Sequence, residues 1–138
     1  MWITHTKILK YISHLTAIPL GLIFIVFGLN FFLKFLPVPT PPAGSPAAFF
    51  MGGMYASGFL AFVKVLEILG GLFVALPQTR HLGILILGPI IVNIAAFNYF
   101  FFGPKALLQT PVLLVCSLAL ILLLASYRPF ARFLSFRD

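Results

Sequence analysis

Acidic residues are almost absent from this chain. Asp and Glu occur only twice in 138 residues, as Glu67 and the C-terminal Asp138, and charged residues of both signs make up only 8% of the sequence. Soluble domains usually carry about 25% charged residues and about 45–50% apolar ones, whereas 62% of this chain is hydrophobic. A soluble domain of this size cannot bury so much apolar surface. We therefore expect lipid to be the solvent for most of the chain.

Cysteine is nearly as scarce, since Cys116 is the only one. One thiol cannot form an internal disulfide, and no C-x-x-C sequence is present, which excludes a self-contained dithiol relay. The sequence has no cluster of metal-ligating residues either, so no metal site is predicted. His14 and His81 fall near the same membrane boundary and are conceivable as axial haem ligands. Histidines at such boundaries are common without a cofactor, however, and haem is not expected.

The excess of basic residues gives a net charge of +7, which would suit a nucleic-acid-binding protein if it covered a polar face. Instead, the basic residues flank apolar runs, as is typical of membrane proteins. None of the seventeen Phe residues lies in a polar RNA- or DNA-binding pattern. Membrane lipids are therefore the expected partners, and nucleic acid is not.

Four apolar runs approach the length of a spanning helix, which needs about 20 residues. They do not alternate polar and apolar residues as the strands of a membrane barrel would. The sequence therefore predicts an all-α fold, an integral membrane four-helix transmembrane bundle that forms one domain over residues 1–138. The expected helices are about 15–36, 58–76, 82–102 and 106–127, and the last of them begins near either Ala106 or Pro111.

The distribution of Lys and Arg predicts that both termini are cytoplasmic, because basic residues near the ends of spanning helices favour that side. One side has Lys105, with Lys34 near the end of the first helix. The other side collects Lys7, Lys10, Arg80, Arg128, Arg132 and Arg137. The tail RPFARFLSFRD alternates basic and aromatic residues, which suits either contact with an anionic leaflet or a simple basic stop after the last helix.

The connection 37–57 is the longest in the chain. Prolines keep its first half out of helix and favour extended polyproline geometry. Its second half contains AAFFMGGMYA, which is apolar but too short to span a membrane, and which we expect to dip into the outer interface. Long loops of compact domains often act as lids, so this proline-rich outer loop is expected to cap the outer face.

Polar residues inside the expected helices fall at the middle or in the outer half of the membrane, and the inner half is nearly pure hydrocarbon. Lys64 and Glu67, in FVKVLEILGG, are three residues apart and can pair on one helix face. Each charge at that depth costs about 2.5–3.5 kcal/mol, so both are expected to face the bundle interior. The predicted ligand-binding residues are Asn30, Lys64, Glu67, Asn93, Asn98 and Tyr99. No catalytic residue is predicted.

Two interpretations of the Lys64–Glu67 pair remain open. It can be a neutralised ion pair that fixes the helix register, or a ligand or proton site together with Asn93 and Asn30. In the second case these four residues should line one polar pocket beneath the proline-rich outer loop. The neighbouring small residues are expected to let helix backbones approach closely; they are Gly70, Gly71, Gly83 and Gly88.

The stretches GLNFFLKFLPVP, PAAFF, SGF, KVLEILGGL, LGILILGPIIVNI and YRPFARF follow one another along most of the chain. Their order and spacing resemble the DoxX/DoxX-like family of small four-helix bacterial membrane proteins. The resemblance places Asn30, Lys64, Glu67 and Asn93 at the recurring polar positions of that family. Relatives often carry a histidine where this chain has Asn98. The resemblance also implies a multi-pass protein of the bacterial inner (cytoplasmic) membrane.

The DoxX name comes from a subunit of a thiosulfate:quinone oxidoreductase, and some members are linked to membrane redox complexes. The resemblance thus implies an accessory membrane subunit, redox- or quinone-associated, with other membrane protein subunits as partners and a quinone or lipid as the bound molecule. The alternative is a non-catalytic scaffold or assembly subunit of a larger membrane complex, which the small size and the lack of a catalytic constellation favour. We expect no catalytic activity from the chain alone.

Overall fold

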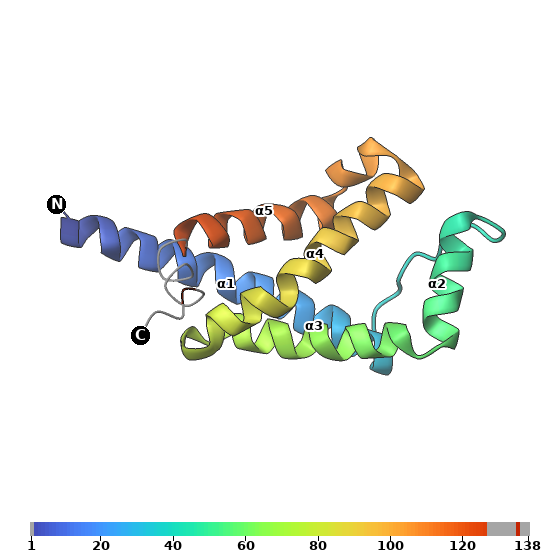
Figure 1. Ribbon diagram of the computed structural model, residues 1–138, viewed down its shortest axis with the longest axis horizontal. Helices are drawn as coiled ribbons and strands as arrows, with labels where there is room; N and C mark the ends of the chain where they lie inside the picture. Colours follow the sequence, from blue (N-terminus) through green and yellow to red (C-terminus); the bar gives the residue numbers. More distant parts are fainter. Residues whose placement is uncertain (1, 127–134, 136–138) are drawn as a thin grey trace.

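The computed structural model describes residues 2–126 and 135. Within them the chain is helical and has no strand, which confirms the predicted all-α class (Figure 1). The helices are α1 (Trp2–Leu33), α2 (Pro46–Ala56), α3 (Phe59–Ala75), α4 (Arg80–Phe102) and α5 (Thr110–Ala125), and short 3-10 turns, Pro77–Thr79 and Pro104–Leu108, precede α4 and α5. The basic tail, with Arg128, Arg132 and Arg137, lies outside the described residues, as does residue 127, the expected end of the last helix.

Two of the helical segments are long and apolar enough to cross a membrane, namely Lys7–Leu33 and Pro77–Phe102. The pair α2 and α3 meets the same criterion only if the two helices form one span, and they bend by 81° at their junction. The apolar helix α5 has 16 residues, which at 1.5 Å per residue gives about 24 Å. Within the described residues, the four expected spans are therefore reduced to two or three helices of spanning length.

Beyond Lys10, the outer surface of α1 is apolar to the end of the helix. Most of its exposed large side chains recur every three or four residues, which places them on one face: Ile8, Tyr11, Leu15, Ile18, Leu22, Val26, Leu29 and Leu33. Six polar side chains are buried among the described residues, namely Ser13, Thr16, Asn30, Glu67, Arg80 and Ser126. An apolar exterior around buried polar groups is the arrangement that a lipid solvent favours, because lipid offers no hydrogen bonds.

Glycines bring α3 close to the helices on both of its sides. Gly71 lies against Gly21 of α1, while Gly70 lies against Leu87 of α4. Gly83, near the start of α4, packs on the backbone of Val74. The close-packing role expected for Gly70, Gly71 and Gly83 is therefore present. It is absent at Gly88, because a Cβ there would meet nothing within 4 Å.

The helices α3 and α4 form a wedge. They are close at the short connection between them, where the glycines lie, and they diverge toward the far end of the molecule (Figure 1). Bulky aromatic side chains join α4 to α2 at the open end: the ring centroids of Phe50 and Phe97 are 5.7 Å apart, and those of Phe50 and Phe101 are 5.4 Å apart. The second helix, α2, therefore covers the open end of the wedge.

The helix boundaries differ from the expected ones at several places. The first helix begins at Trp2 rather than near residue 15, and its added turns pack on the end of α5 through a contact between the Ser13 and Ser126 hydroxyls (3.2 Å). Part of the proline-rich outer loop is helical, because the Ser45 hydroxyl accepts a hydrogen bond from the Ala48 N–H and Pro46 begins the helix. The last helix, α5, begins at Thr110, which agrees with the later of its two expected starts, and the chain before it forms a 3-10 turn.

Candidate ligand-binding site

The ion pair of FVKVLEILGG lies at the centre of the molecule. Glu67 is the middle residue of the 17 in α3, and its carboxylate oxygen Oε2 is 3.0 Å from Nζ of Lys64. The Glu67 side chain is only 6% exposed and that of Lys64 is 23% exposed. The spacing of three residues correctly predicted this pairing, since such residues share a helix face. Glu67 therefore faces the bundle interior and not the outer surface.

A cavity of about 510 Å³ lies beside the pair, between α2, α3 and α4. We call it the aromatic cleft. Its polar lining residues are Lys64, Glu67, Asn93 and Asn98, and most of the others are aromatic or Met, including Phe50, Met51, Met54, Phe97, Phe100 and Phe101. Small-molecule sites usually measure about 300–1,000 Å³ and combine an apolar wall with a few polar groups. The aromatic cleft has that size and composition.

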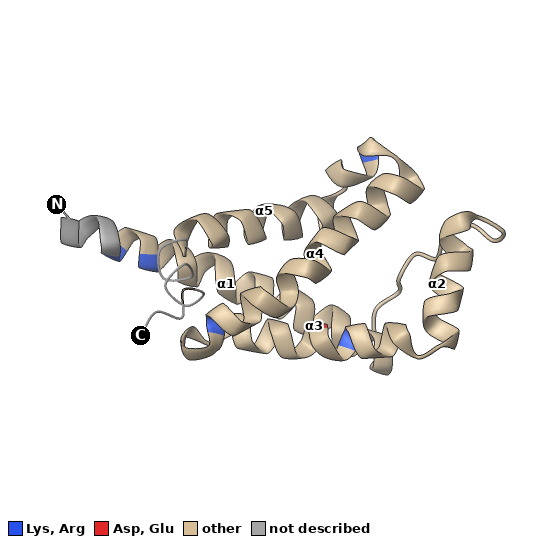
Figure 2. Ribbon diagram, viewed as in Figure 1, with Lys and Arg blue, Asp and Glu red and all other residues tan. Residues whose placement is uncertain are grey.

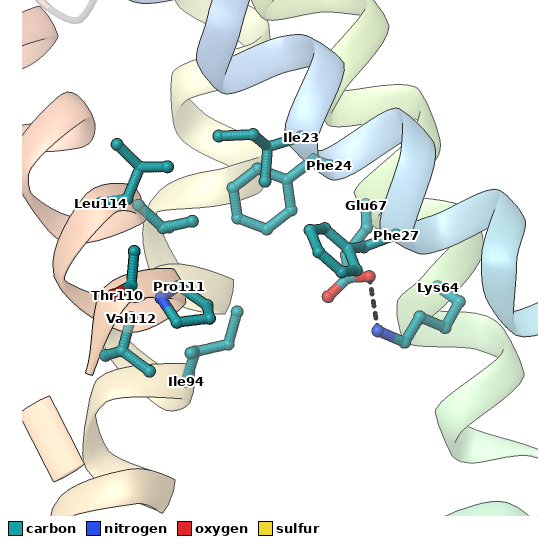
Figure 3. Close-up of a pocket in the computed structure, with 11 residues that line it drawn as sticks. Ile23, Phe24, Phe27, Lys64, Glu67, Ile94, Thr110, Pro111, Val112 and Leu114 are labelled. Carbon is teal, nitrogen blue, oxygen red and sulfur yellow. Dashed lines mark ion pairs between the residues drawn. The ribbon is translucent and has the colours of Figure 1, made fainter. Parts of the chain in front are cut away.

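A second cavity, of about 350 Å³, lies on the other side of the pair, between α1, α3, α4 and α5. We call it the apolar chamber, and Figure 3 shows its lining side chains. Apart from the ion pair, Thr110 is its one polar lining residue among those described. The remaining side chains are Ile23, Phe24, Phe27, Ile94, Pro111, Val112, Leu114 and Val115.

The two amides of the aromatic cleft lie on α4. Asn93 donates from Nδ2 to the carbonyl oxygen of Pro89 (2.9 Å), and Asn98 donates from Nδ2 to the carbonyl oxygen of Ile94 (2.8 Å). Each bond reaches back one helical turn and fixes the orientation of the amide. Because a side-chain amide has two N–H groups and one oxygen, each Asn can also bind a molecule in the cleft.

Asn30 lies elsewhere, although its depth in the membrane suggested the same pocket. It is 4% exposed. Its Nδ2 donates to the carbonyl oxygen of Leu36 (3.1 Å), and its Oδ1 accepts from the N–H of Leu36 (2.7 Å). Between them, Lys34 has a left-handed φ of 53°. Asn30 thus secures the change of chain direction after α1, and it lines neither cavity, so the expected pocket is corrected at this residue.

Tyr99 also lines neither cavity. It is 45% exposed, and its ring meets that of Phe100 edge to face with centroids 5.2 Å apart. Successive residues of an α-helix point about 100° apart, and the Tyr99 side chain lies outside the cleft that its neighbour Asn98 lines. Of the six predicted ligand-binding residues, the structure brings together Lys64, Glu67, Asn93 and Asn98.

A second polar cluster, which we did not predict, joins α1, α3 and α4 near the start of α4. Arg80 is 6% exposed. Its Nε donates to the carbonyl oxygen of Val74 (2.9 Å), its Nη2 donates to that of Ala75 (3.4 Å), and its Nη1 is 3.2 Å from Nδ1 of His14. Arg80 and His14 fall just outside the expected spans 82–102 and 15–36, so the cluster lies at the edge of these spans, and the nearly pure hydrocarbon inner half stays a prediction.

A sequence signal for this cluster existed. Arg80 follows α3 after a very short connection, and a basic side chain in that position satisfies the last carbonyl groups of the preceding helix. Thr79 does the same with its hydroxyl, which donates to the carbonyl oxygen of Phe73 (3.0 Å). The contact of His14 with Arg80 gives this histidine a structural partner.

Basic residues lie at the two ends of the molecule, with Lys64 between them. Figure 2 shows basic residues near the start of α1 and of α4 at one end, and another beyond the end of α4 at the opposite end. In residues 2–126 and 135, no three His, Cys, Asp or Glu side chains gather into a group suited to a metal ion. The polar chemistry of the cleft is therefore that of one ion pair and two amides.

No protein-family model, curated protein or solved structure matches the chain. The DoxX-like resemblance is thus neither supported nor refuted by comparison, and a function for the chain has to be inferred from its own geometry.

Proposed function

We propose that the chain is a multi-pass protein of the bacterial inner membrane, a DoxX-like four-helix bundle in which α1, α3, α4 and α5 cross the bilayer and both termini are cytoplasmic. The apolar exterior of α1 and the two segments of spanning length support a membrane location. Basic residues in the first turns of α1 and at the start of α4 support the orientation.

Within this bundle, the aromatic cleft is proposed to bind a lipid-soluble molecule with a flat head that accepts hydrogen bonds, such as a quinone ring. The observation that carries this proposal is the placement of one ammonium group and two amides among aromatic walls. The N–H groups of Lys64, Asn93 and Asn98 can donate to ring carbonyl oxygens. The rings of Phe97 and Phe101, whose centroids are 4.8 Å apart, offer faces and edges to a flat head.

The chain would then act as an accessory subunit of a membrane redox complex. It would supply a quinone site, while a partner subunit carries the centre that transfers electrons. Glu67 has a defined part in this arrangement, because its carboxylate holds the Lys64 ammonium in place (3.0 Å) next to the cleft.

A non-catalytic scaffold or assembly subunit is the second candidate. Large aromatic side chains project from α2 and from the end of α4, and Phe49, Tyr55 and Phe100 are 72%, 61% and 79% exposed. Such side chains are enriched where membrane proteins meet one another or the membrane interface. In this case the ion pair would fix helix packing and the cleft would stay without a specific ligand.

Binding of a short-chain benzoquinone to the purified protein in detergent, measured by equilibrium dialysis, tests the proposal. Asn98→Ala should weaken binding about fivefold, since one hydrogen bond contributes about 1 kcal/mol. Gln109→Ala is the matched control, because it removes an exposed amide that lines neither cavity. Equal affinities of the two variants would contradict the cleft site. Isolation of the protein from native membranes with a partner subunit but without quinone would favour the scaffold.

A further inference from the structure

The aromatic cleft and the apolar chamber adjoin. Three residues line both cavities, namely Lys64 and Glu67 of α3 and Ile94 of α4. Figure 3 shows the pair on one side of the chamber and Ile94 on another. Long side chains can move between rotamers without moving the helices, so the boundary between the two spaces can open.

The chemistry of the two cavities is different and complementary. The cleft adds two amides to the ion pair, whereas the chamber adds a single hydroxyl, that of Thr110, to a lining of aliphatic, proline and Phe side chains. Hydrogen bonds hold a polar head most effectively when several donors converge on it. A hydrocarbon chain needs only close packing against apolar atoms. The polar head of a bound molecule therefore belongs in the aromatic cleft, and its hydrocarbon chain belongs in the apolar chamber.

We propose that the two cavities form one site for an amphipathic lipid-soluble molecule, whose polar head occupies the aromatic cleft and whose hydrocarbon chain passes Ile94 into the apolar chamber. This inference rests on the proposed function and adds the second half of the ligand. The alternative course for the chain is outward from the cleft into the bilayer. The chamber would then contribute nothing to affinity.

Two neighbouring leucines of α5 allow a matched test. Leu114 lines the chamber and Leu113 does not, yet both side chains are 46% exposed. Leu114→Trp fills part of the chamber, while Leu113→Trp adds the same bulk outside it. The probes are a benzoquinone head alone and the same head with a ten-carbon hydrocarbon chain. Their affinities for the full-length protein in detergent are compared. A single-chain phosphatidylethanolamine serves as a third probe.

The chain-bearing quinone should bind the parent protein and Leu113→Trp equally. Leu114→Trp should weaken it about tenfold and change the affinity of the bare head by less than about twofold, because only the chain loses packing contacts. If Leu114→Trp does not fold, Leu114→Phe makes the same comparison with a smaller ring.

The remaining outcomes separate the two proposals. If both quinones bind and Leu114→Trp behaves like Leu113→Trp, the chain does not enter the chamber and this inference is overturned, while the quinone site stands. If neither quinone binds the parent protein, the proposed quinone-binding function is overturned. If only the phosphatidylethanolamine binds and Leu114→Trp weakens it, the two-part site is supported with a phospholipid head in place of a quinone.

Discussion

Gly21 of α1 and Gly71 of α3 meet backbone to backbone. A Cβ added to Gly21 would lie 2.5 Å from the carbonyl oxygen of Gly71, and one added to Gly71 would lie 2.6 Å from that of Gly21. Both distances are far below van der Waals contact, so the two helices approach this closely only because neither has a side chain there.

Replacing one of these glycines should therefore loosen the bundle. Gly71→Ala should lower the stability of the protein by about 1–3 kcal/mol, the usual cost of overpacking a close contact. Gly88→Ala is the control, because it adds the same methyl group where nothing lies within 4 Å, and Ala is the better helix former. Thermal unfolding in detergent, followed by circular dichroism, should show a lower midpoint for Gly71→Ala alone. Equal midpoints for the two variants would mean that α1 and α3 are farther apart at these glycines than the structure shows.

The ion pair predicts an unequal response to its two single substitutions. Lys64→Met leaves the Glu67 carboxylate, which is only 6% exposed, without its counter-charge, whereas Glu67→Gln leaves the more exposed Lys64 ammonium. Breaking a buried pair costs about 3–5 kcal/mol. We expect Lys64→Met to approach this cost and Glu67→Gln to remain below it. Thermal midpoints in detergent measure both.

The double variant Lys64→Met with Glu67→Gln separates the pair from its members. It should be more stable than Lys64→Met alone, because no unpaired charge is left in the interior. Additive losses would show that the two side chains act independently.

Substitution of Asn30 should lower the stability of the protein without weakening quinone binding. Asn30→Ala removes both hydrogen bonds to Leu36, and it should cost about 1 kcal/mol, since Leu36 is exposed enough for other groups to replace them. Quinone affinity should stay at the level of the parent protein, in contrast to Asn98→Ala. Parallel dialysis and unfolding measurements check both statements. Weaker binding by Asn30→Ala, with unfolding unchanged, would return this residue to the ligand site.

The proposed orientation predicts opposite labelling of two exposed glutamines. Gln78 lies in the connection between α3 and α4, and Gln109 lies just before α5. In a Cys116→Ser background, Gln109→Cys should react with an impermeant maleimide on intact cells, and Gln78→Cys should react only after lysis. Neither change alters a charge, so the basic residues that set the orientation remain. The reverse pattern would place the termini outside.

Local signals in the sequence predicted part of this site. The pairing of Lys64 with Glu67 follows from a spacing within one helix, and it does not depend on how the helices pack. Helix geometry places Tyr99 about 100° from Asn98, but it does not show which of the two lines the cleft, because the adjacent residues Phe97 and Asn98 both line it. The expected depth of Asn30 in the membrane likewise did not indicate which way its side chain faces. Its hydrogen-bond partner Leu36 lies beyond the end of the helix.

Other features depend on packing between distant parts of the chain. The polar residues at the start of α1 are typical of a segment that flanks a membrane span. The contact of Ser13 with Ser126 shows that this segment packs on α5 as part of the helix. The helix α2 had a usable signal, since Ser45 followed by Pro46 is a favourable start. Its perpendicular course beside α3 could not be predicted, because the aromatic contacts of Phe50 with α4 decide it.

The wedge of α3 and α4 has a consequence for the surrounding lipids. In the proposed transmembrane arrangement, the pair of α3 and α4, which is narrow where its glycines lie and broad where α2 covers it (Figure 1), would take up unequal areas in the two leaflets. Lipids next to the narrow end must spread to fill the space that the protein leaves, while those next to the broad end are crowded aside. Such a shape favours a membrane that curves around it, so we expect many copies together to bend the bilayer toward the narrow end.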